Sequence, residues 1–243
     1  MKRTIVVISA GLGVPSTTRM LADQMGAAVS TQLGELGARA VLDVVDLRDY
    51  ATDIANNMVS GYAGPALTDV INRVAAADAM IAVTPTFSAS YSGLFKSFFD
   101  VLDPKFLDGM PVLFGATGGS PRHSLVLDMA IRPLFSYLRA HTMPTAVYAS
   151  PEDWGPGGGD ATGLEYRISQ GAGELAAVLA PGSPSAFPST TPAAGVAFPL
   201  SSSGPANGGP GFQPDHRAKR DARERTGMTS LPFEQLLAQT QRR

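Results

Sequence analysis

Five short apolar runs, separated by helix-like segments, constrain the fold of this chain more than any other feature. The runs cover residues 4–8, 41–46, 79–83, 112–116 and 145–149. Amphipathic patterns between and after them predict helices at about 17–36, 66–76, 92–102, 124–139 and 163–179. Short apolar strands that alternate with helices are typical of a parallel sheet covered on both faces. The sequence therefore predicts an α/β fold with a doubly wound, five-stranded parallel sheet, for which 2-1-3-4-5 is the simplest strand order.

The composition of the chain changes near residue 180, which sets the expected domain boundary. Residues 175–214 contain no charged residue, and residues 181–214 consist mainly of proline, serine, glycine and alanine. Such a segment buries too little apolar surface to offset its ordering entropy, so we expect a disordered linker. Residues 215–243 begin with a charged run and contain a short apolar cluster at 231–237, which we interpret as a docking helix. Residues 1–180 form the expected domain.

Charge and cysteine content exclude several classes of function. The formal net charge is −2 and no long basic block is present, so we expect no nucleic-acid partner. The chain has no cysteine, so redox chemistry would depend on a bound cofactor, and we expect no metal site. The first apolar run is shorter than a signal peptide's, and no window approaches the roughly 20 apolar residues of a membrane span. We therefore expect a cytoplasmic protein that does not enter a membrane.

The first candidate binding loop follows the run at 4–8 and ends where the first helix begins. It is rich in glycine and hydroxyl side chains, a composition that suits a phosphate at a helix N-terminus. The alternative is an ordinary strand–helix turn with Ser16 as the N-cap. A nucleotide-triphosphate loop is excluded because no Gly-Lys-Ser/Thr is present, and the dinucleotide fingerprint lacks its third glycine, although Asp46 partly mimics its acidic residue. The candidate binding residues here are Ser9, Gly11, Ser16, Thr17 and Thr18.

A second candidate loop leaves the run at 79–83 through a proline and ends at Gly93, where a helix begins. Small hydroxyl residues and two aromatic residues offer hydrogen bonds and a flat apolar surface to a planar ligand. The candidate binding residues are Pro85, Thr86, Phe87 and Ser88. Phe87 and Tyr91 could instead be core or dimer-contact aromatics, and Lys96 is better explained as a solvated helix charge than as a catalytic group.

The third candidate loop follows the run at 112–116 and contains adjacent glycines, which allow a backbone to approach a flat ring closely. The candidate binding residues are Thr117, Gly118 and Gly119. His123 is a candidate proton donor, with a helix-start position or a subunit contact as the alternative. Arg122 is a candidate contact for a nucleotide phosphate. Since the three loops follow strands one, three and four, the predicted topology places them along one crevice.

Together the three loops resemble those of NAD(P)H-dependent FMN reductases. The similar features are the serine- and threonine-rich turn at 16–18, the run from Pro85 to Ser88 followed by Gly93-x-x-Lys96, and the Gly118-Gly119 pair. Within this family, the run 117–125 (Thr-Gly-Gly-x-x-Arg-His-Ser-Leu) and the Phe-Glu-Gln-Leu-Leu segment at 233–237 resemble an actinobacterial group that accompanies luciferase-like monooxygenases. The resemblance spans about residues 3–180.

The resemblance implies a flavodoxin-like domain that binds FMN and uses NADPH or NADH as co-substrate. The first loop would hold the FMN phosphate, and the other two would flank the ring. Hydride transfer to the flavin would need no catalytic side chain. The resemblance also implies a homodimer or a dimer of dimers, and an acceptor that is free FMN, a quinone, oxygen or a partner monooxygenase. Two alternatives stay open: a flavodoxin-type electron-transfer protein without a nicotinamide site, and a nicotinamide-binding Rossmann protein without flavin.

Overall fold

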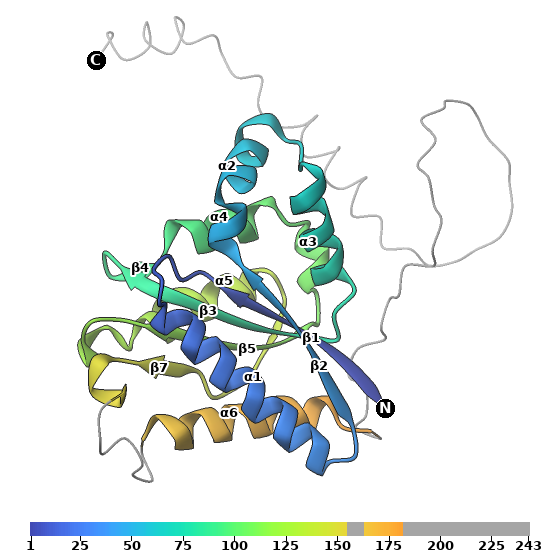
Figure 1. Ribbon diagram of the computed structural model, residues 1–243, viewed down its shortest axis with the longest axis vertical. Coiled ribbons are helices and arrows are strands. Elements are labelled where there is room, and N and C mark those ends of the chain that lie inside the picture. Colours follow the sequence, from blue (N-terminus) through green and yellow to red (C-terminus); the bar gives the residue numbers. More distant parts are fainter. Residues whose placement is uncertain (155–162, 182–243) are drawn as a thin grey trace, which may run out of the picture. The chain divides into compact units, whose positions relative to one another are not determined.

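A central sheet organises the fold (Figure 1), and it has seven strands in the part of the chain that the structure describes. The computed structural model describes residues 1–154 and 163–181. Four strands are long enough to span the core, and three are short additions at the edges or loops. The strands are β1 (Lys2–Ser9), β2 (Arg39–Asp46), β3 (Ala79–Phe87), β4 (Ser90–Tyr91), β5 (Pro111–Thr117), β6 (His141–Thr142) and β7 (Val147–Ala149).

The order of the parallel strands is β2-β1-β3-β5, with β6 and β7 both paired to β5. All of these pairs are parallel, whereas β4 pairs with β3 in antiparallel fashion. The predicted fourth and fifth strands correspond to β5 and to the β6–β7 edge. The predicted flavodoxin-like order 2-1-3-4-5 is therefore confirmed. The three consecutive neighbours β1, β3 and β5 place their carboxyl ends side by side.

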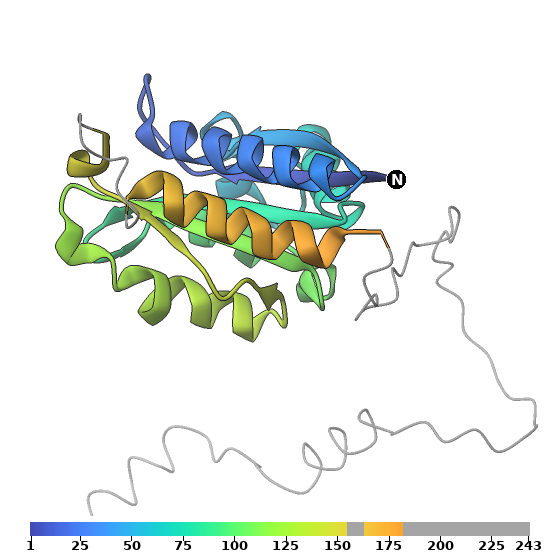
Figure 2. The ribbon, with the colours of Figure 1, turned by 90° about the horizontal axis from the view of Figure 1, so that it is seen from below.

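Helices cover both faces of the sheet and bury two separate apolar cores. One face carries α1 (Thr17–Glu35) and α6 (Leu164–Leu179), which lie side by side (Figure 2). The other face carries α2 (Ala51–Ser60), α3 (Pro65–Ala75), α4 (Gly93–Val101) and α5 (Arg132–Tyr137). Successive side chains of a strand point to opposite faces, so nearly all residues of the central strands are buried. Gly37 follows α1 with φ of 78° and fills the expected left-handed C′ position.

Helix α2 and the hairpin of β3 and β4 are among the elements that were not predicted from the sequence. In helix α2 only Ile54 is fully buried, while the apolar side chains of Met58 and Val59 are exposed, and the short helix η1 (Leu47–Tyr50) joins α2 to β2. The second element is the hairpin of β3 and β4, which turns at Ser88 and Ala89 with φ of 48° and 65°. Positive φ at both turn residues is the type I′ geometry, which normally selects glycine or asparagine. The usual sequence signal for this turn is therefore absent.

The predicted helix at 124–139 is shorter and less regular than expected. The segment begins with a 3-10 turn, η3 (Pro121–His123), and continues through a π turn, η4 (Leu127–Ile131), into α5. At the junction, the N–H of Arg132 donates to the carbonyl of Leu127 across five residues. Pro133 follows directly and has no N–H to donate, so it cannot maintain the regular α-helical ladder at this point.

The fifth strand, predicted at 145–149, forms only at 147–149 as β7, and the irregular segment 143–146 separates it from the short strand β6, which was not predicted. The guanidinium of Arg132 donates to the carbonyl oxygens of Met143 and Pro144, each at 3.0 Å. From the opposite face, the carboxylate of Glu174 accepts hydrogen bonds from the N–H of Thr145 at 2.8 Å and from its hydroxyl at 2.6 Å. Side chains of α5's first residue and of α6 thus replace the ladder hydrogen bonds that a continuous strand would make.

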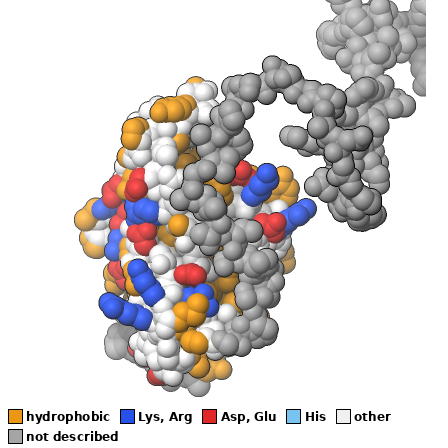
Figure 3. All heavy atoms as spheres, turned by 90° about the vertical axis from the view of Figure 1, so that its right-hand side faces the viewer, with side chains coloured by type: hydrophobic (Ala, Val, Ile, Leu, Met, Phe, Trp, Pro, Cys, Tyr) orange, Lys and Arg blue, Asp and Glu red, His pale blue; other side chains and the backbone are white. Residues whose placement is uncertain are grey.

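The predicted linker at 181–214 and the docking helix in 215–243 lie outside the described residues, except for residue 181. The glycine run at 157–159 also lies outside them. None of the described helices is long and apolar enough to cross a membrane. On the face shown in Figure 3, acidic and basic side chains of the described residues alternate with apolar ones instead of forming a patch of one sign.

Candidate functional site

The candidate site lies at the carboxyl edge of the sheet, where β1, β3 and β5 end next to one another. Ser9 at the end of β1 pairs with Val83 of β3, and Pro85 of β3 pairs with Thr117 of β5. The three predicted loops leave the sheet from these positions. The topology therefore brings together, at one edge, segments that are more than 100 residues apart in the sequence.

The first loop ends at a well-capped helix N-terminus. Ser16 has extended dihedral angles, and its hydroxyl accepts a hydrogen bond from the N–H of Arg19 at 3.2 Å, so it is the N-cap of α1. A Cβ at Gly11 would overlap this hydroxyl, which explains the glycine. Among the described residues, no acceptor takes the N–H groups of 11–14 or of 16–18. The loop therefore presents unengaged donors at the positive end of a helix.

Hydroxyl groups at this edge fall into two classes. The hydroxyl of Ser9 is buried and has no hydrogen-bond partner among the described residues. Thr18 is also buried, but its hydroxyl lies 2.7 Å from that of Thr117 and joins the first loop to the third. Thr17, by contrast, is exposed at the first position of α1. Thr18 and Thr117 thus have a structural partner, whereas Ser9 and Thr17 do not.

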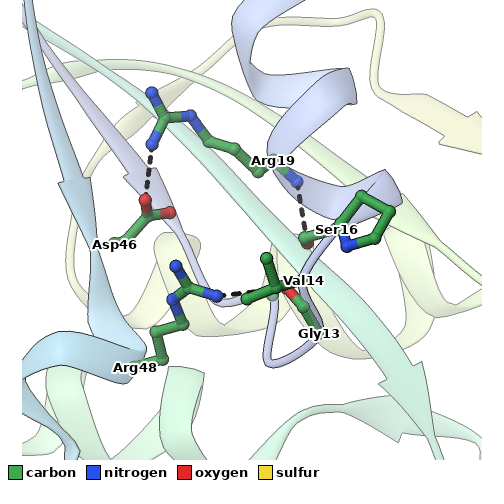
Figure 4. A pocket seen from close by; sticks show the side chains of 8 residues that line it. Gly13, Val14, Ser16, Arg19, Asp46 and Arg48 are labelled. Atoms are coloured by element: carbon green, nitrogen blue, oxygen red, sulfur yellow. Dashed lines mark hydrogen bonds and ion pairs between the residues drawn. The ribbon is translucent and has the colours of Figure 1, made fainter.

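A cavity of about 230 Å³ lies over this loop and is lined by Gly11, Gly13, Val14, Pro15, Ser16, Arg19, Asp46 and Arg48 (Figure 4). Arg19 forms ion pairs with Asp23 and Asp46. These carboxylates, of which Asp23 has the larger effect, raise the pKa of the Arg19 guanidinium above the ordinary value for arginine. The guanidinium of Arg48 donates to the carbonyl of Gly13 at 3.2 Å and so holds the loop from outside. The cavity suits a phosphate and its neighbouring atoms better than a whole flavin nucleotide, since complete ligand pockets usually exceed about 300 Å³.

The second loop is held by hydroxyl groups and ends in the strained hairpin. The buried hydroxyl of Thr84 accepts a hydrogen bond from the N–H of Ser92 at 3.1 Å, and Ser92 caps α4. Pro85 is buried, whereas Phe87 is 49% exposed and Ser88 lies at the exposed turn. The hydroxyl of Thr86 is buried without a regular hydrogen bond, although it lies close enough to Tyr148 to influence the pKa of that phenol.

The third loop contains two glycines in different surroundings. A Cβ at Gly118 would overlap the hydroxyl of Tyr148 and lie 3.1 Å from its Cζ, so packing within the protein already requires glycine there. Gly119 is exposed, and a Cβ there would meet nothing within 4 Å. The backbone of Gly119 is therefore open to a ligand, whereas Gly118 is covered by Tyr148.

The remaining candidates lie at the surface or in the core. His123, at the end of η3, and Arg122 are exposed. Lys96 forms an ion pair with Asp100 on the surface of α4, which supports its interpretation as a solvated charge. Tyr91 packs against the core with its ring centroid 6.0 Å from that of Phe95. The polar groups that remain at the carboxyl edge of the sheet are therefore mainly backbone N–H groups and hydroxyls.

These residues fit the FMN that the sequence resemblance implies. The unengaged N–H groups of the first loop and the orphaned hydroxyl of Ser9 suit an anionic phosphate. The open backbone at Gly119 and the exposed ring of Phe87 suit a flat apolar ring. The site assignments themselves stay predictions.

Two residues at this edge were missed by sequence reasoning. Tyr148 lies within an apolar strand, where a tyrosine is easily counted as a core residue, although its polar end usually finds a partner when buried. Arg48 follows the second strand, and only the folded chain brings it to the Gly13 carbonyl. The available sequence signal was its position two residues after Asp46, at the carboxyl end of the second predicted strand, where a side chain can reach the loop that follows the first strand.

Comparison with known proteins agrees with this geometry. Residues 3–155 match the family described as NADPH-dependent FMN reductase. An FMN reductase (NADPH) from Pseudomonas aeruginosa is 37% identical over 152 residues, which cover 62% of this chain and 78% of that protein. An NADH-dependent FMN reductase from Pseudomonas putida is 34% identical over 148 residues, which cover 61% of this chain and 77% of that one.

Solved structures extend the similarity to the three-dimensional fold. An oxidoreductase from Corynebacterium diphtheriae has a TM-score of 0.69 and 43% identity, covering 72% of this chain and 95% of that one. The apo form of an NADH:FMN oxidoreductase has a TM-score of 0.63 and 26% identity, covering 75% and 92%. The match to the family covers well over half of the chain and includes all three loops. The chain is a member of the NADPH-dependent FMN reductase family.

Proposed function

We propose that this protein binds FMN at the carboxyl edge of β1, β3 and β5 and reduces it with NADPH or NADH. The observation that supports this most, in a chain of this family, is the N-terminus of α1 with its unengaged N–H groups; the orphaned hydroxyl of Ser9, at the end of β1, adds to it. A helix N-terminus of this kind binds phosphate through both its dipole and its free donors.

Each loop has its own part in the proposed site. The N–H groups of 11–14 and of 16–18, with the hydroxyls of Ser9, Ser16 and Thr17, would hold the phosphate. The segment from Pro85 to Ser88 and the Gly118-Gly119 pair would lie along the ring, with the backbone of Gly119 facing it and Gly118 packed against Tyr148. Thr18 and Thr117 would support the site through their mutual hydrogen bond instead of binding the ligand directly.

Bound FMN supplies the chemistry by accepting hydride from the nicotinamide. The protein contributes by fixing the phosphate, shaping a flat surface for the two rings and placing donors beside them. No proton at a side chain has to move for this transfer. His123 is exposed on η3 and stays only a candidate proton donor.

The finer assignments rest on sequence and surface. Three exposed apolar side chains in the segment 125–137 (Leu125 at 63%, Met129 at 73% and Tyr137 at 82%) support the proposed homodimer or dimer of dimers, because exposed apolar surface favours an interface. The electron acceptor is proposed to be free FMN, a quinone, oxygen or a partner monooxygenase. The relatives named above include an NADPH-dependent and an NADH-dependent enzyme, so both nucleotides are proposed. The cytoplasmic location stays a prediction from the sequence.

A spectroscopic titration tests the proposed function. FMN is added to the flavin-free protein while its fluorescence is followed, and NADPH or NADH is then added without oxygen. We expect saturable binding of one FMN per chain and bleaching of the flavin band by at least one nucleotide. Binding without bleaching by either nucleotide would favour the flavodoxin-type alternative. Absence of FMN binding would contradict the proposal.

A further inference from the structure

We propose that Tyr148 is a positioning residue, whose hydroxyl holds the loop from Thr117 to Ser120 in the conformation that presents its backbone to the flavin ring. The expected effect on FMN rests on the proposed function, but the hydrogen bond from Tyr148 to the loop is present in the protein without a ligand. Tyr148 is neither a predicted ligand nor a group that touches the reacting atoms.

The phenol of Tyr148 lies where two of the three loops meet. Its hydroxyl donates to the carbonyl oxygen of Ser120 at 2.8 Å, and the side chain is only 7% exposed. The position that a Cβ at Gly118 would take overlaps this hydroxyl and is 3.4 Å from the Cβ of Thr86. Tyr148 therefore packs between the Gly118 backbone and the loop that follows β3.

Before Ser120 the chain has little side-chain restraint, because Gly118 and Gly119 have no side chains to limit their conformations. After it, the Ser120 hydroxyl accepts a hydrogen bond from the N–H of Arg122 at 3.3 Å and caps η3, which begins at Pro121. The hydrogen bond from Tyr148 ties this capped turn to β7. The Ser120 carbonyl also accepts from the N–H of His123, at a longer 3.2 Å. Burial raises the pKa of the Tyr148 phenol, which keeps the donor proton in place.

Strand β7 fixes the loop at both ends and leaves its middle open. The N–H of Gly118 donates to the carbonyl of Ala149 at 3.0 Å, and the Ser120 carbonyl accepts from Tyr148. Between these two points, the N–H groups of Gly119 and Ser120 have no acceptor in the part of the chain that the structure describes. These two donors are the groups that the proposed positioning would hold ready for the polar edge of the ring.

The position of Tyr148 is itself secured without any ligand. The guanidinium of Arg167 donates to the Tyr148 carbonyl at 3.2 Å and to the carboxylate of Asp153 at 2.6 Å. Asp153 also accepts from the N–H and hydroxyl of Ser150, each at 2.8 Å. Burial opposes ionisation of Asp153, but these hydrogen bonds together hold its pKa below the usual range. The start of α6 thus braces β7 directly beneath the loop.

Loss of the hydroxyl would loosen the loop and weaken its hydrogen bonds to the flavin. Donors near the ring tune the electronic properties of a bound flavin, so a displaced loop should change both affinity and spectrum. The Tyr148→Phe variant retains the ring and its packing, and therefore removes the hydrogen bond with little change in volume.

The test compares Tyr148→Phe with wild type in three measurements. Hydrogen–deuterium exchange of the hydrogen-bonded amides of Gly118, Arg122 and His123 in the flavin-free protein should accelerate at least threefold. The dissociation constant for FMN should rise about threefold to tenfold, and the absorption maxima of bound FMN should shift. Val74→Ala, in the buried face of α3 at the other end of the sheet, is the control for lost stability and should leave all three unchanged. Tyr166→Phe, 53% exposed, controls for the chemical change.

The exchange measurement needs no flavin, so it separates this inference from the proposed function. Wild-type exchange in Tyr148→Phe would overturn the inference, even if FMN binds well. Faster exchange with unchanged FMN affinity and spectrum would overturn the functional part of it. If the wild-type protein binds no FMN, the proposed function fails, and the exchange measurement still decides whether the Tyr148 hydroxyl restrains the loop. Should Tyr148→Phe not fold, Gly118→Ala, whose Cβ would displace the same hydroxyl, should reproduce the faster exchange, and wild-type exchange there would overturn the inference.

Discussion

The two adjacent glycines of the third loop allow ligand contact to be separated from internal packing. A Cβ at Gly118 would overlap the Tyr148 hydroxyl, whereas a Cβ at Gly119 would meet no protein atom within 4 Å. Neither residue has a positive φ, so neither substitution is strained by the backbone itself. We therefore expect Gly119→Val to affect FMN binding without loss of stability, whereas Gly118→Ala should lower stability and, by displacing the Tyr148 hydroxyl, also loosen the loop.

The expected magnitudes follow from the space around each residue. Extra methyl groups forced into a packed region cost about 1–3 kcal/mol, which we expect for the unfolding free energy of Gly118→Ala. Gly119→Val should stay within about 0.5 kcal/mol of wild type in the flavin-free protein, because its side chain enters solvent. If the flavin ring lies against this backbone, the same overpacking cost of about 1–3 kcal/mol falls on binding, which weakens FMN affinity about 5-fold to 150-fold.

The assay combines urea unfolding of the flavin-free protein with FMN titration, and Gly119→Ala provides a smaller step in the same direction. A graded loss of affinity from Gly to Ala to Val, without loss of stability, would place the ring beside Gly119. The added side chain would meet no protein atom, so it can weaken FMN binding only by contact with the flavin. An FMN affinity in Gly119→Val equal to that of wild type would therefore refute the placement of the ring at this loop.

Three further predictions concern the phosphate loop, the last strand and acid stability. Ser16→Gly keeps most of the N-cap stability but removes a hydroxyl donor to a charged acceptor, so FMN affinity should fall about tenfold or more in a fluorescence titration; unchanged affinity would remove Ser16 from the phosphate site. Arg132→Met loses two hydrogen bonds to carbonyl oxygens and should lower the unfolding free energy by about 2–4 kcal/mol. The control Asp128→Asn breaks only a surface ion pair with Arg132 and should cost less than about 1 kcal/mol. Equal costs would show that the ion pair, and not the carbonyl contacts, accounts for the stabilisation by Arg132. The pKa of Asp153 is lower in the folded protein than in the unfolded chain, so its contribution to stability is present above the unfolded pKa of about 4 and is lost as the pH falls through the folded value. The difference in unfolding free energy between wild type and Asp153→Asn, measured by urea unfolding, should therefore shrink from pH 6 to pH 3. A difference that stays constant with pH would contradict this prediction.

The regular part of the fold was predictable because strongly apolar strands alternate with helices. The runs at 4–8, 79–83 and 112–116 have few polar residues, and each forms a buried strand of the sheet. The prediction failed where side chains replace backbone pairing. The strand predicted at 145–149 begins only at residue 147 because Arg132 and Glu174 bind the segment 143–146, and neither contact is visible in a local pattern. The hairpin at Ser88 and Ala89 lacks the glycine that would have indicated it.

The site could be located from the sequence only as far as its loops. Strand order brings Ser9, Pro85 and Thr117 to one edge, and that order followed from the alternation of elements. Which groups face a ligand depends on distant contacts. The sequence predicts Thr18 together with Ser16 and Thr17 as a phosphate donor, and only the fold reveals that its hydroxyl meets that of Thr117, 99 residues away. Likewise, only the folded chain explains that Gly118 is covered by Tyr148 while Gly119 is open.

The irregular segment between β6 and β7 has a consequence for how this edge tolerates changes in length. Val112 pairs with Thr142 and Gly115 with Val147, so two residues of β5 face four residues of the neighbouring edge. The surplus is even, and alternation therefore keeps Tyr148 on one face of the sheet and Val147 and Ala149 on the other. Loss of one residue within 143–146 would exchange these faces and turn the phenol toward α1 and α6, whereas loss of two would restore its direction. Among related chains, this edge should accept insertions and deletions in steps of two wherever the side chain at this position serves the neighbouring loop.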